Sequence, residues 1–178
     1  MATFAKTELL LDHKFDPVTC RHTMNGWCSV LHCHHYSALY TQLADDCGFM
    51  DAKKLLAEVS EDNFYTMLVS YFEDHNIEKV EDRISIAEQY YAAVGLGKLE
   101  VVFAGTESAE ALLHHSHVDE GWKKKWGKRD KPVNFITCGY FAALLAATFD
   151  RSPRTFVVKE TESIISGAER SRFEAAAV

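Results

Sequence analysis

The sequence predicts an α+β domain in which an antiparallel sheet of four to five strands carries long helices on one side. The apolar residues recur with a period near 3.6 from about residue 27 to residue 95, and the period changes toward 2 at residues 98–104 and 109–115. Most strand-like segments fall in the second half of the chain, with long helical segments before and between them. This order is typical of the α+β class. The segment 133–149 is almost wholly apolar, so it must form a buried helix.

Residues 1–26 are expected to form an N-terminal arm or short strands. Phe4, Leu9 and Leu11 alternate weakly, so this part could be an edge strand or an arm that packs on a partner subunit. Asn25 and Gly26 form a strong turn signal. The turn could either close a hairpin or introduce a helix.

Residues 27–95 are expected to form the helical part of the domain. A first helix is predicted over 27–46 and ends at Gly48. A second helical run covers 51–72, as two helices or as one bent helix, and a third covers 78–94. The first helix is predicted from residues that share one face: Cys28, His32, Tyr36, Leu39, Leu43 and Cys47.

Residues 97–175 are expected to form the sheet and its remaining helices. Two strands are predicted over 98–104 and 109–115, and a short helix over 119–126. Pro132 opens the apolar helix, and a final hairpin follows at 155–175. No internal repeat or linker is visible, so the chain is expected to be a single domain.

Composition excludes several classes of function. The 178 residues, 47% hydrophobic and 25% charged, can bury a core without disulfide bonds. A net charge of −7 argues against nucleic acid as a partner, because nucleic-acid affinity depends on clustered cations. Five cysteines at irregular spacings indicate a reducing compartment. No apolar run approaches the ~20 residues that cross a bilayer. The chain is therefore expected to be cytoplasmic, without membrane contact.

Metal-competent side chains are concentrated near the start of the first predicted helix. On a helix, Cys28, His32 and His35 would share one face and could bind a transition metal such as zinc or iron. Alternatively, Cys28 packs as a small hydrophobic residue and the histidines line a cavity or the surface. No paired metal motif strengthens the first interpretation. A fourth ligand would have to come from the predicted sheet, where the candidates are His114, His115, His117 and Glu160.

Two further segments have more than one interpretation. Trp122 and Trp126 lie on one face of a lysine-rich helix, which is typical of an amphipathic surface helix. The alternative is a basic aromatic patch that binds nucleic acid or a membrane, which the acidic chain as a whole disfavours. Around Gly139, small residues alternate with Tyr140 and Phe141. Such a helix permits close approach either of another helix or of a flat ligand.

The C-terminal hairpin carries the most distinctive pattern, Glu160-x2-Ser163-x3-Gly167-x3-Ser171-x-Phe173. This spacing resembles the closing signature of the 4-vinyl reductase family of hydrocarbon-binding domains, in which the two serine positions are commonly cysteine. The resemblance extends upstream through the segments 112–123, 127–133 and 139–143, and covers about residues 99–175. The family is related to the sensor domains of aromatic-responsive activators and to vesicle-tethering subunits.

The resemblance implies the fold and a pocket between helices and sheet. Sensor members look like zinc proteins that use cysteines and a glutamate at this hairpin. Ser163 and Ser171 are poor zinc ligands, because a neutral hydroxyl competes badly with a thiolate, so zinc is not expected there. The resemblance also makes His117 the best candidate for a polar ligand contact, because a neutral imidazole both donates and accepts hydrogen bonds.

These observations favour a small-molecule-binding protein that senses or carries a hydrophobic or aromatic ligand. Two alternatives stay open. One is an enzyme that acts through a Cys28 thiol with His32 as base, or through a metal-bound water. The other is a dimeric adaptor. The chain shows no DNA-binding or ATPase segment, so a complete transcription activator is not expected. A homodimer is expected, with helix faces from 51–94 at its interface. The predicted pocket is lined by Trp27, Tyr36, Trp122, Tyr140 and Phe141, together with His117.

Overall fold

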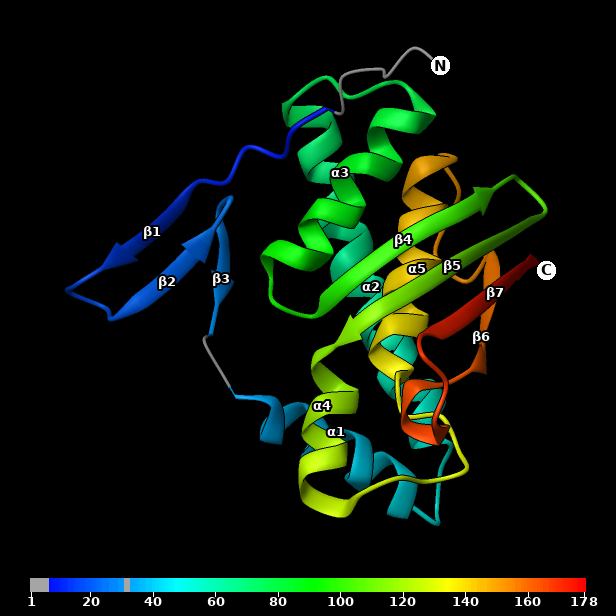
Figure 1. Ribbon diagram of the computed structural model, residues 1–178. Helices are drawn as coiled ribbons and strands as arrows, with labels where there is room; N and C mark the ends of the chain where they lie inside the picture. The colour runs from blue at the N-terminus through cyan, green and yellow to red at the C-terminus, as the bar shows by residue number, and fades with distance from the viewer. Residues whose placement is uncertain (1–6, 31–32) are drawn as a thin grey trace.

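The computed structural model describes residues 7–30 and 33–178, and it has the predicted α+β architecture (Figure 1). The main sheet has four antiparallel strands in the order β4-β5-β7-β6. Three long helices lie on one side of this sheet: α2 (Ala52–Asp74), α3 (Val80–Ala93) and α5 (Phe135–Thr148). The strands are β4 (Gly97–Ala104), β5 (Ser108–Ser116), β6 (Phe156–Glu162) and β7 (Ser171–Ala177).

Side chains of the edge strand β6 alternate between the two faces of the sheet. Phe156 is buried and Val158 is half-buried, whereas Val157 and Lys159 point to the solvent. Between β6 and β7 the chain makes a short 3₁₀ turn, η1 (Ile164–Ser166), and then passes through Gly167 at φ +112°. A left-handed backbone of this kind favours glycine, so the turn explains the glycine of the C-terminal pattern.

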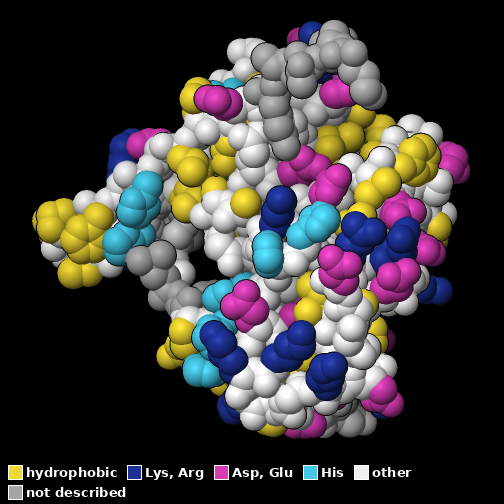
Figure 2. Space-filling model, viewed as in Figure 1, with side chains coloured by type: hydrophobic (Ala, Val, Ile, Leu, Met, Phe, Trp, Pro, Cys, Tyr) yellow, Lys and Arg dark blue, Asp and Glu magenta, His cyan; other side chains and the backbone are white. Residues whose placement is uncertain are grey.

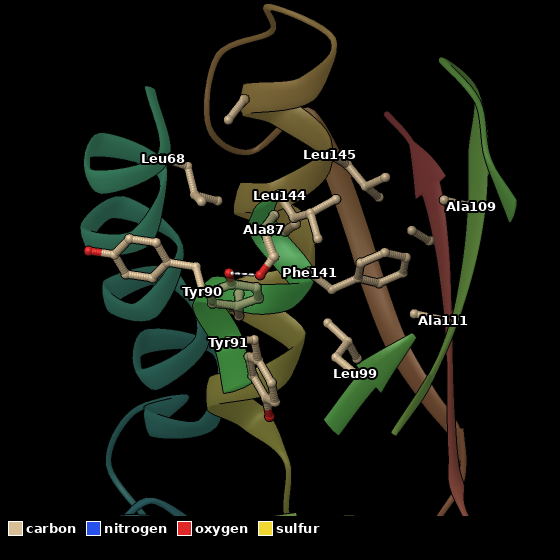
Figure 3. Packing of buried hydrophobic residues seen from close by; sticks show 14 of the residues in the cluster. Leu68, Ala87, Tyr90, Tyr91, Leu99, Ala109, Ala111, Phe141, Leu144 and Leu145 are labelled. Atoms are coloured by element: carbon tan, nitrogen blue, oxygen red, sulfur yellow. Dashed lines mark hydrogen bonds between the residues drawn. The ribbon is translucent and has the colours of Figure 1, made fainter. Parts of the chain in front are cut away.

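The core lies between α5 and the sheet on one side and between α5 and the other helices on the opposite side. Phe141 and Leu145 approach Ala109 and Ala111 of β5, and Leu68 of α2 lies on the far side of α5 (Figure 3). Because α5 is covered on both sides, eleven of its residues are buried. This arrangement confirms that the apolar segment is a buried helix.

Helix α5 comes closest to α2 at Gly139. A Cβ atom added at Gly139 would overlap the carbonyl oxygen of Ala57 and would lie 2.8 Å from Cβ of Ser60. The Ser60 hydroxyl donates a hydrogen bond to the Ile136 carbonyl oxygen at 2.8 Å across the same contact. The small residues around Gly139 therefore serve helix packing. Helix α2 is continuous from Ala52 to Asp74, which settles the choice between one helix and two.

The N-terminal part forms a separate three-stranded antiparallel sheet beside the helices (Figure 1). Asn25 and Gly26 have φ values of +47° and +82°, and they close the hairpin between the second and third strands. Figure 2 shows this sheet projecting from the body, with hydrophobic side chains at its outer end. Phe4 lies outside the described residues. The strands are β1 (His13–Asp16), β2 (Arg21–Met24) and β3 (Trp27–Ser29).

The helix predicted over 27–46 is wrong in its first third and in its buried face. β3 occupies 27–29, and α1 begins only at His34 and ends at Asp46. The buried residues of α1 are small or hydroxylated, whereas Leu39 and Leu43 are 38% and 58% exposed. Small residues are buried because α1 lies very close to α4 (His117–Trp126). The contact is so close that a Cβ atom added at Gly121 would overlap the His34 backbone. The buried residues are Ser37, Ala38, Thr41 and Ala44.

Helix α4 matches its predicted position, and its lysines point to the solvent as an amphipathic surface helix requires. Within the described ranges 7–30 and 33–178, no helix is both long enough and apolar enough to cross a membrane.

Candidate functional site

A buried polar cluster lies where the end of β5, the start of α5 and the C-terminal hairpin meet. Local sequence places its members. Ser116 ends β5 and caps α4, because its hydroxyl accepts a hydrogen bond from the Asp119 backbone N–H at 3.0 Å. Asn134 directly precedes α5, and Glu160 lies on β6. We call Ser116, Asp119, Asn134 and Glu160 the Asn134 cluster.

The Asn134 amide joins the whole cluster. Its Nδ2 group donates to Asp119 Oδ2 and to Glu160 Oε1, both at 2.9 Å. Its backbone N–H donates to Glu160 Oε2 at 3.2 Å, and its Oδ1 accepts from the Ser116 hydroxyl at 2.9 Å. Asn134 is 0% exposed and Asp119 is 1% exposed. One amide therefore connects the buried Asp119 carboxyl group to the partly buried Glu160 carboxyl group.

Burial raises the pKa of both carboxyl groups of the cluster. Burial raises the pKa of Asp119, and the hydrogen bonds from Asn134 and Ser116 offset part of this effect. Burial also raises the pKa of Glu160, against the opposing effects of Ser163, Asn134 and Ser171. Asp119 Oδ1 is buried without a hydrogen-bond partner among the residues that the structure describes. No lysine or arginine donates a hydrogen bond to the cluster within those residues.

The residues at this position do not fit a zinc ion. Both carboxylate oxygens of Glu160 already accept hydrogen bonds from Asn134. The Ser171 hydroxyl accepts from the Ile164 backbone N–H at 2.9 Å, and the Ser163 hydroxyl completes no hydrogen bond within the described part of the chain, although it faces Glu160. Zinc prefers thiolate and imidazole ligands, and burial raises the pKa of the nearby Cys138 thiol, which opposes its binding as a thiolate. No group of three metal-competent side chains suitable for a metal ion occurs in the described residues.

A groove of about 600 Å³ begins beside this cluster and runs between α2, α5 and β6. Cys138 lies one helical turn after Asn134 and lines the groove. Burial, followed by the nearby Glu160, raises the pKa of the Cys138 thiol, so the thiol stays neutral. The apolar residues that line the groove are Ala57, Phe135, Gly139, Ala142, Phe156 and Val158, and the exposed Val157 also borders it.

The charged residues at the rim of the groove mostly pair with one another. The Arg154 guanidinium donates to Glu61 Oε2 at 2.7 Å and to Asp62 Oδ2 at 2.8 Å. Lys53 pairs with Asp45 at 2.5 Å, and Lys54 lies 3.7 Å from Glu58. Because these charges are already compensated, the rim favours a ligand without a net charge.

The structure does not bring the six predicted ligand contacts together. Tyr140 and Phe141 are fully buried in the core, and the Tyr140 hydroxyl donates to the Ala87 carbonyl oxygen at 2.6 Å. Trp122 packs with Val118, Val133 and Ile165 in a second small cluster. Tyr36 is exposed on α1, and Trp27 packs from β3 against the edge of the core. None of these residues lines the groove.

The predicted histidine contact also lies elsewhere. His117 is the first residue of α4, and its ring meets the His34 ring edge-on with the centroids 6.0 Å apart. His114 bonds to Glu100 at 2.6 Å, and His115 is exposed on β5. A role of His117 in ligand binding stays a prediction.

The geometric basis for the predicted metal site is wrong. Cys28 lies exposed on β3 and His35 lies on α1, so no single helix carries both. His32 lies outside the described residues. Metal binding by Cys28, His32 and His35 therefore stays a prediction without a shared helical face to support it.

Sequence reasoning missed Asn134, Asp119 and Ser116. The signals that could have found them are local. Ser116 and Asp119 have the spacing of a helix cap, and Asn134 stands between Pro132 and an apolar helix, where a capping residue is common. Their convergence on Glu160 depends on how β6 pairs with β7, which local spacing does not reveal.

Comparison with known proteins places this fold. No family model matches the sequence, and no curated protein matches it significantly. Among solved structures, the phenol-responsive sensory domain of the transcription activator PoxR, bound to phenol, superposes with a TM-score of 0.77 at 14% identity, over 93% of this chain and 84% of that domain.

Two other solved structures superpose on this chain over most of their length. A vinyl-4-reductase family protein from Methanocaldococcus jannaschii gives a TM-score of 0.55 at 16% identity, over 84% of each chain. A trafficking protein particle complex subunit 3 from Naegleria fowleri, covalently bound to palmitic acid, gives 0.54 at 12% identity, over 80% of this chain and 90% of that one. The fold is therefore the one shared by these sensory, vinyl-4-reductase and trafficking proteins, which confirms the resemblance drawn from the C-terminal pattern. At these identities the comparisons define the fold alone.

Proposed function

We propose that this protein is a small-molecule-binding domain that senses or carries an uncharged hydrophobic or aromatic ligand in the groove between α2, α5 and β6. The observation that carries the proposal is the groove itself, which has a volume of about 600 Å³ and an apolar floor. Small-molecule sites are commonly concave, largely apolar and of 300–1,000 Å³, with few polar groups. The solved structures of similar fold include proteins bound to phenol and to palmitic acid.

The chemistry of the groove favours a neutral ligand. The Cys138 thiol at the floor stays protonated, and Glu160 behind it is hydrogen-bonded to Asn134. Arg154 at the rim is held by Glu61 and Asp62. A charged ligand would have to displace these partners, whereas an apolar ligand would gain buried surface at about 25 cal/mol per Å².

A ligand-dependent rise in thermal stability tests the proposal. We expect phenol, which is uncharged at pH 7, to raise the melting temperature of the full chain, because a ligand that binds only the folded state stabilises it by RT ln(1 + [L]/Kd). At a ligand concentration of 100 times Kd the gain is about 2.7 kcal/mol. For a chain of this size, that corresponds to about 5–11 °C.

A matched pair of variants locates the binding. Val158→Trp places a large ring in the groove, whereas Val102→Trp places the same ring on an exposed position of β4, outside the groove. The stabilisation by ligand should disappear in Val158→Trp and persist in Val102→Trp. Unchanged stabilisation by the ligand in both variants would show that the ligand binds outside the groove. The absence of any stabilisation of the parent protein by phenol would contradict the proposal.

We also propose a homodimer. Leu55 and Val59 are exposed on one face of α2, within the predicted interface segment 51–94. Exposed apolar helix faces of this kind are commonly covered in an oligomer. Sedimentation velocity at micromolar concentration should give the mass of two chains. The change Leu55→Glu with Val59→Glu should give a folded monomer, and a parent protein that sediments as a monomer would contradict the proposal.

A further inference from the structure

A second cavity, of about 320 Å³, lies between the N-terminal arm and the helices α2 and α3. It shares no lining residue with the groove, which begins at the opposite end of α2. The arm contributes Leu10, Leu11, Asp12, Asn25 and Trp27, and the helices with the residue after α2 contribute Met67, Ser70, Tyr71, Asp74, His75 and Tyr90.

Aromatic rings make up much of the cavity wall. Tyr71 stacks on His75 with the ring centroids 4.2 Å apart and an interplanar angle of 29°. Tyr90 meets Tyr71 edge-on at 6.3 Å, and Trp27 closes the side of the arm. Several π-faces around one small volume are suited to a flat ring or to an organic cation.

The Tyr90 hydroxyl is a second, independent feature of this cavity. Tyr90 is 1% exposed, and its hydroxyl is buried without a hydrogen-bond partner in the described ranges of the chain. The Tyr90 ring points away from the sheet side of the core (Figure 3). The Tyr71 hydroxyl, by contrast, accepts a hydrogen bond from the Leu10 backbone N–H at 2.8 Å. Because buried polar groups are normally paired, the Tyr90 hydroxyl is poised for a ligand atom.

The charge around the cavity has one sign. Asp12 and Asp74 line it, and no lysine or arginine does. Asp12 pairs with Lys14 at 2.5 Å, whereas Asp74 makes no ion pair within residues 7–30 and 33–178. An exposed carboxylate at the mouth of an aromatic cavity attracts cations, and the net charge of −7 adds to this attraction.

We propose that this cavity binds a small aromatic amine in its ammonium form. The ring would lie against Trp27 and Tyr71, and the ammonium group would lie between the Asp74 carboxylate and the oxygen of Tyr90. Each part of the ligand then has a stated partner: the π-faces bind the ring and the cation, the carboxylate compensates the charge, and the buried hydroxyl gains the hydrogen bond that it lacks.

Calorimetric titration of the full chain tests this proposal with three probes of similar shape. The probes are 2-phenylethylamine, which is cationic at pH 7, 2-phenylethanol, which is neutral, and phenylacetate, which is anionic. We expect the amine to bind at least tenfold more tightly than the alcohol, and phenylacetate not to bind. Equal affinity for the amine and the alcohol, or no binding of the amine at millimolar concentration, would overturn the proposal.

Variants assign the binding to this cavity. Asp74→Asn should weaken binding of the amine about tenfold, whereas the matched change Glu73→Gln, at the neighbouring exposed residue outside the cavity, should leave it unchanged. Tyr90→Phe should also weaken binding while the protein stays folded. Equal effects of Asp74→Asn and Glu73→Gln would overturn the assignment.

Binding of the amine to this cavity should be independent of the groove. Val158→Trp should abolish the response to phenol and leave binding of the amine intact. Loss of amine binding in Val158→Trp would place the amine in the groove and refute a second site.

Discussion

Replacing Asn134 with alanine tests the buried cluster most directly. The change removes two N–H bonds to carboxyl groups and one bond from the Ser116 hydroxyl, all at 2.9 Å. A hydrogen bond to a charged group contributes about 1.5–3 kcal/mol, so the two bonds to Asp119 and Glu160 together give about 3–6 kcal/mol. Glu160 is only partly buried, and water can replace its lost bond in part. We therefore expect the free energy of unfolding to fall by about 4 kcal/mol at pH 7.

Urea unfolding followed by far-UV circular dichroism measures this loss. With a slope of about 2 kcal/mol per M, the midpoint should fall by about 2 M. The control is Asn63→Ala, since Asn63 is exposed on α2 and its amide donates a weak hydrogen bond to the Met67 sulfur at 3.5 Å. This control should change the free energy of unfolding by less than about 0.5 kcal/mol. A loss in Asn134→Ala below about 1 kcal/mol would refute the view that one amide holds the two carboxyl groups.

Three other outcomes follow from the same contacts. Gly139→Ala should lower the free energy of unfolding by about 1–3 kcal/mol, because the added Cβ would overlap the Ala57 backbone. The control Gly48→Ala should be neutral, because the space around Gly48 is open. Equal urea midpoints for the two variants would contradict the close contact between α2 and α5. Because the pKa of Asp119 is raised, the folded state binds more protons than the unfolded chain, and the stability falls as the pH rises from the ordinary pKa value of 3.8 toward the raised one. Thermal melts of Asp119→Asn should show a smaller fall in stability over this pH window. An unchanged pH profile in this variant would exclude Asp119 as the source of the fall. Chelation with EDTA should leave the melting temperature unchanged, and bound zinc found by elemental analysis together with a lowered melting temperature would contradict the metal-free cluster.

Much of the fold could be predicted because periodicity reports burial. The change from helical to strand period marks the start of β4, and the apolar run 133–149 contains α5. A periodic pattern is strong where one side of an element is buried, and a continuous apolar run is strong where all sides are buried. The Asn25 and Gly26 turn was equally visible, but its two possible uses could be separated only by the pairing of β2 with β3.

The first helix shows where periodicity fails. Leu39 and Leu43 have the spacing of a buried stripe, yet α1 buries Ser37, Ala38 and Thr41 instead. Small residues allow α1 to approach α4 closely, and this gain depends on Gly121 in a distant segment. A pattern within one helix cannot reveal which face its partner selects, so the face predicted for the metal ligands was wrong as well.

The candidate site was predictable only in part. The C-terminal pattern correctly indicated the fold, and Glu160 was recognised as a candidate ligand residue. The predicted pocket lining was based on aromatic residues, but Tyr140 and Phe141 are core residues, because large rings stabilise a core as readily as they line a cavity. The groove is built mainly from small and aliphatic residues, such as Ala57, Ala142 and Val158, which no pattern distinguishes from ordinary packing.

The chemistry of Asn134 explains how this hairpin is held without cysteines. Three segments must meet here, namely the end of β5, the start of α5 and the hairpin that carries Glu160, and a tetrahedral metal site would connect them through its ligands. A side-chain amide has two N–H donors and one acceptor, so it can bind two carboxyl groups and one hydroxyl at once. Asn134 uses all of them, and its backbone N–H adds a fourth bond. An aspartate at this position would add a third carboxyl group and remove both side-chain donors. An alanine would offer no side-chain donor and no acceptor. Serines at positions 163 and 171 are therefore compatible with an intact fold, because hydrogen bonds from one buried amide hold the three segments together.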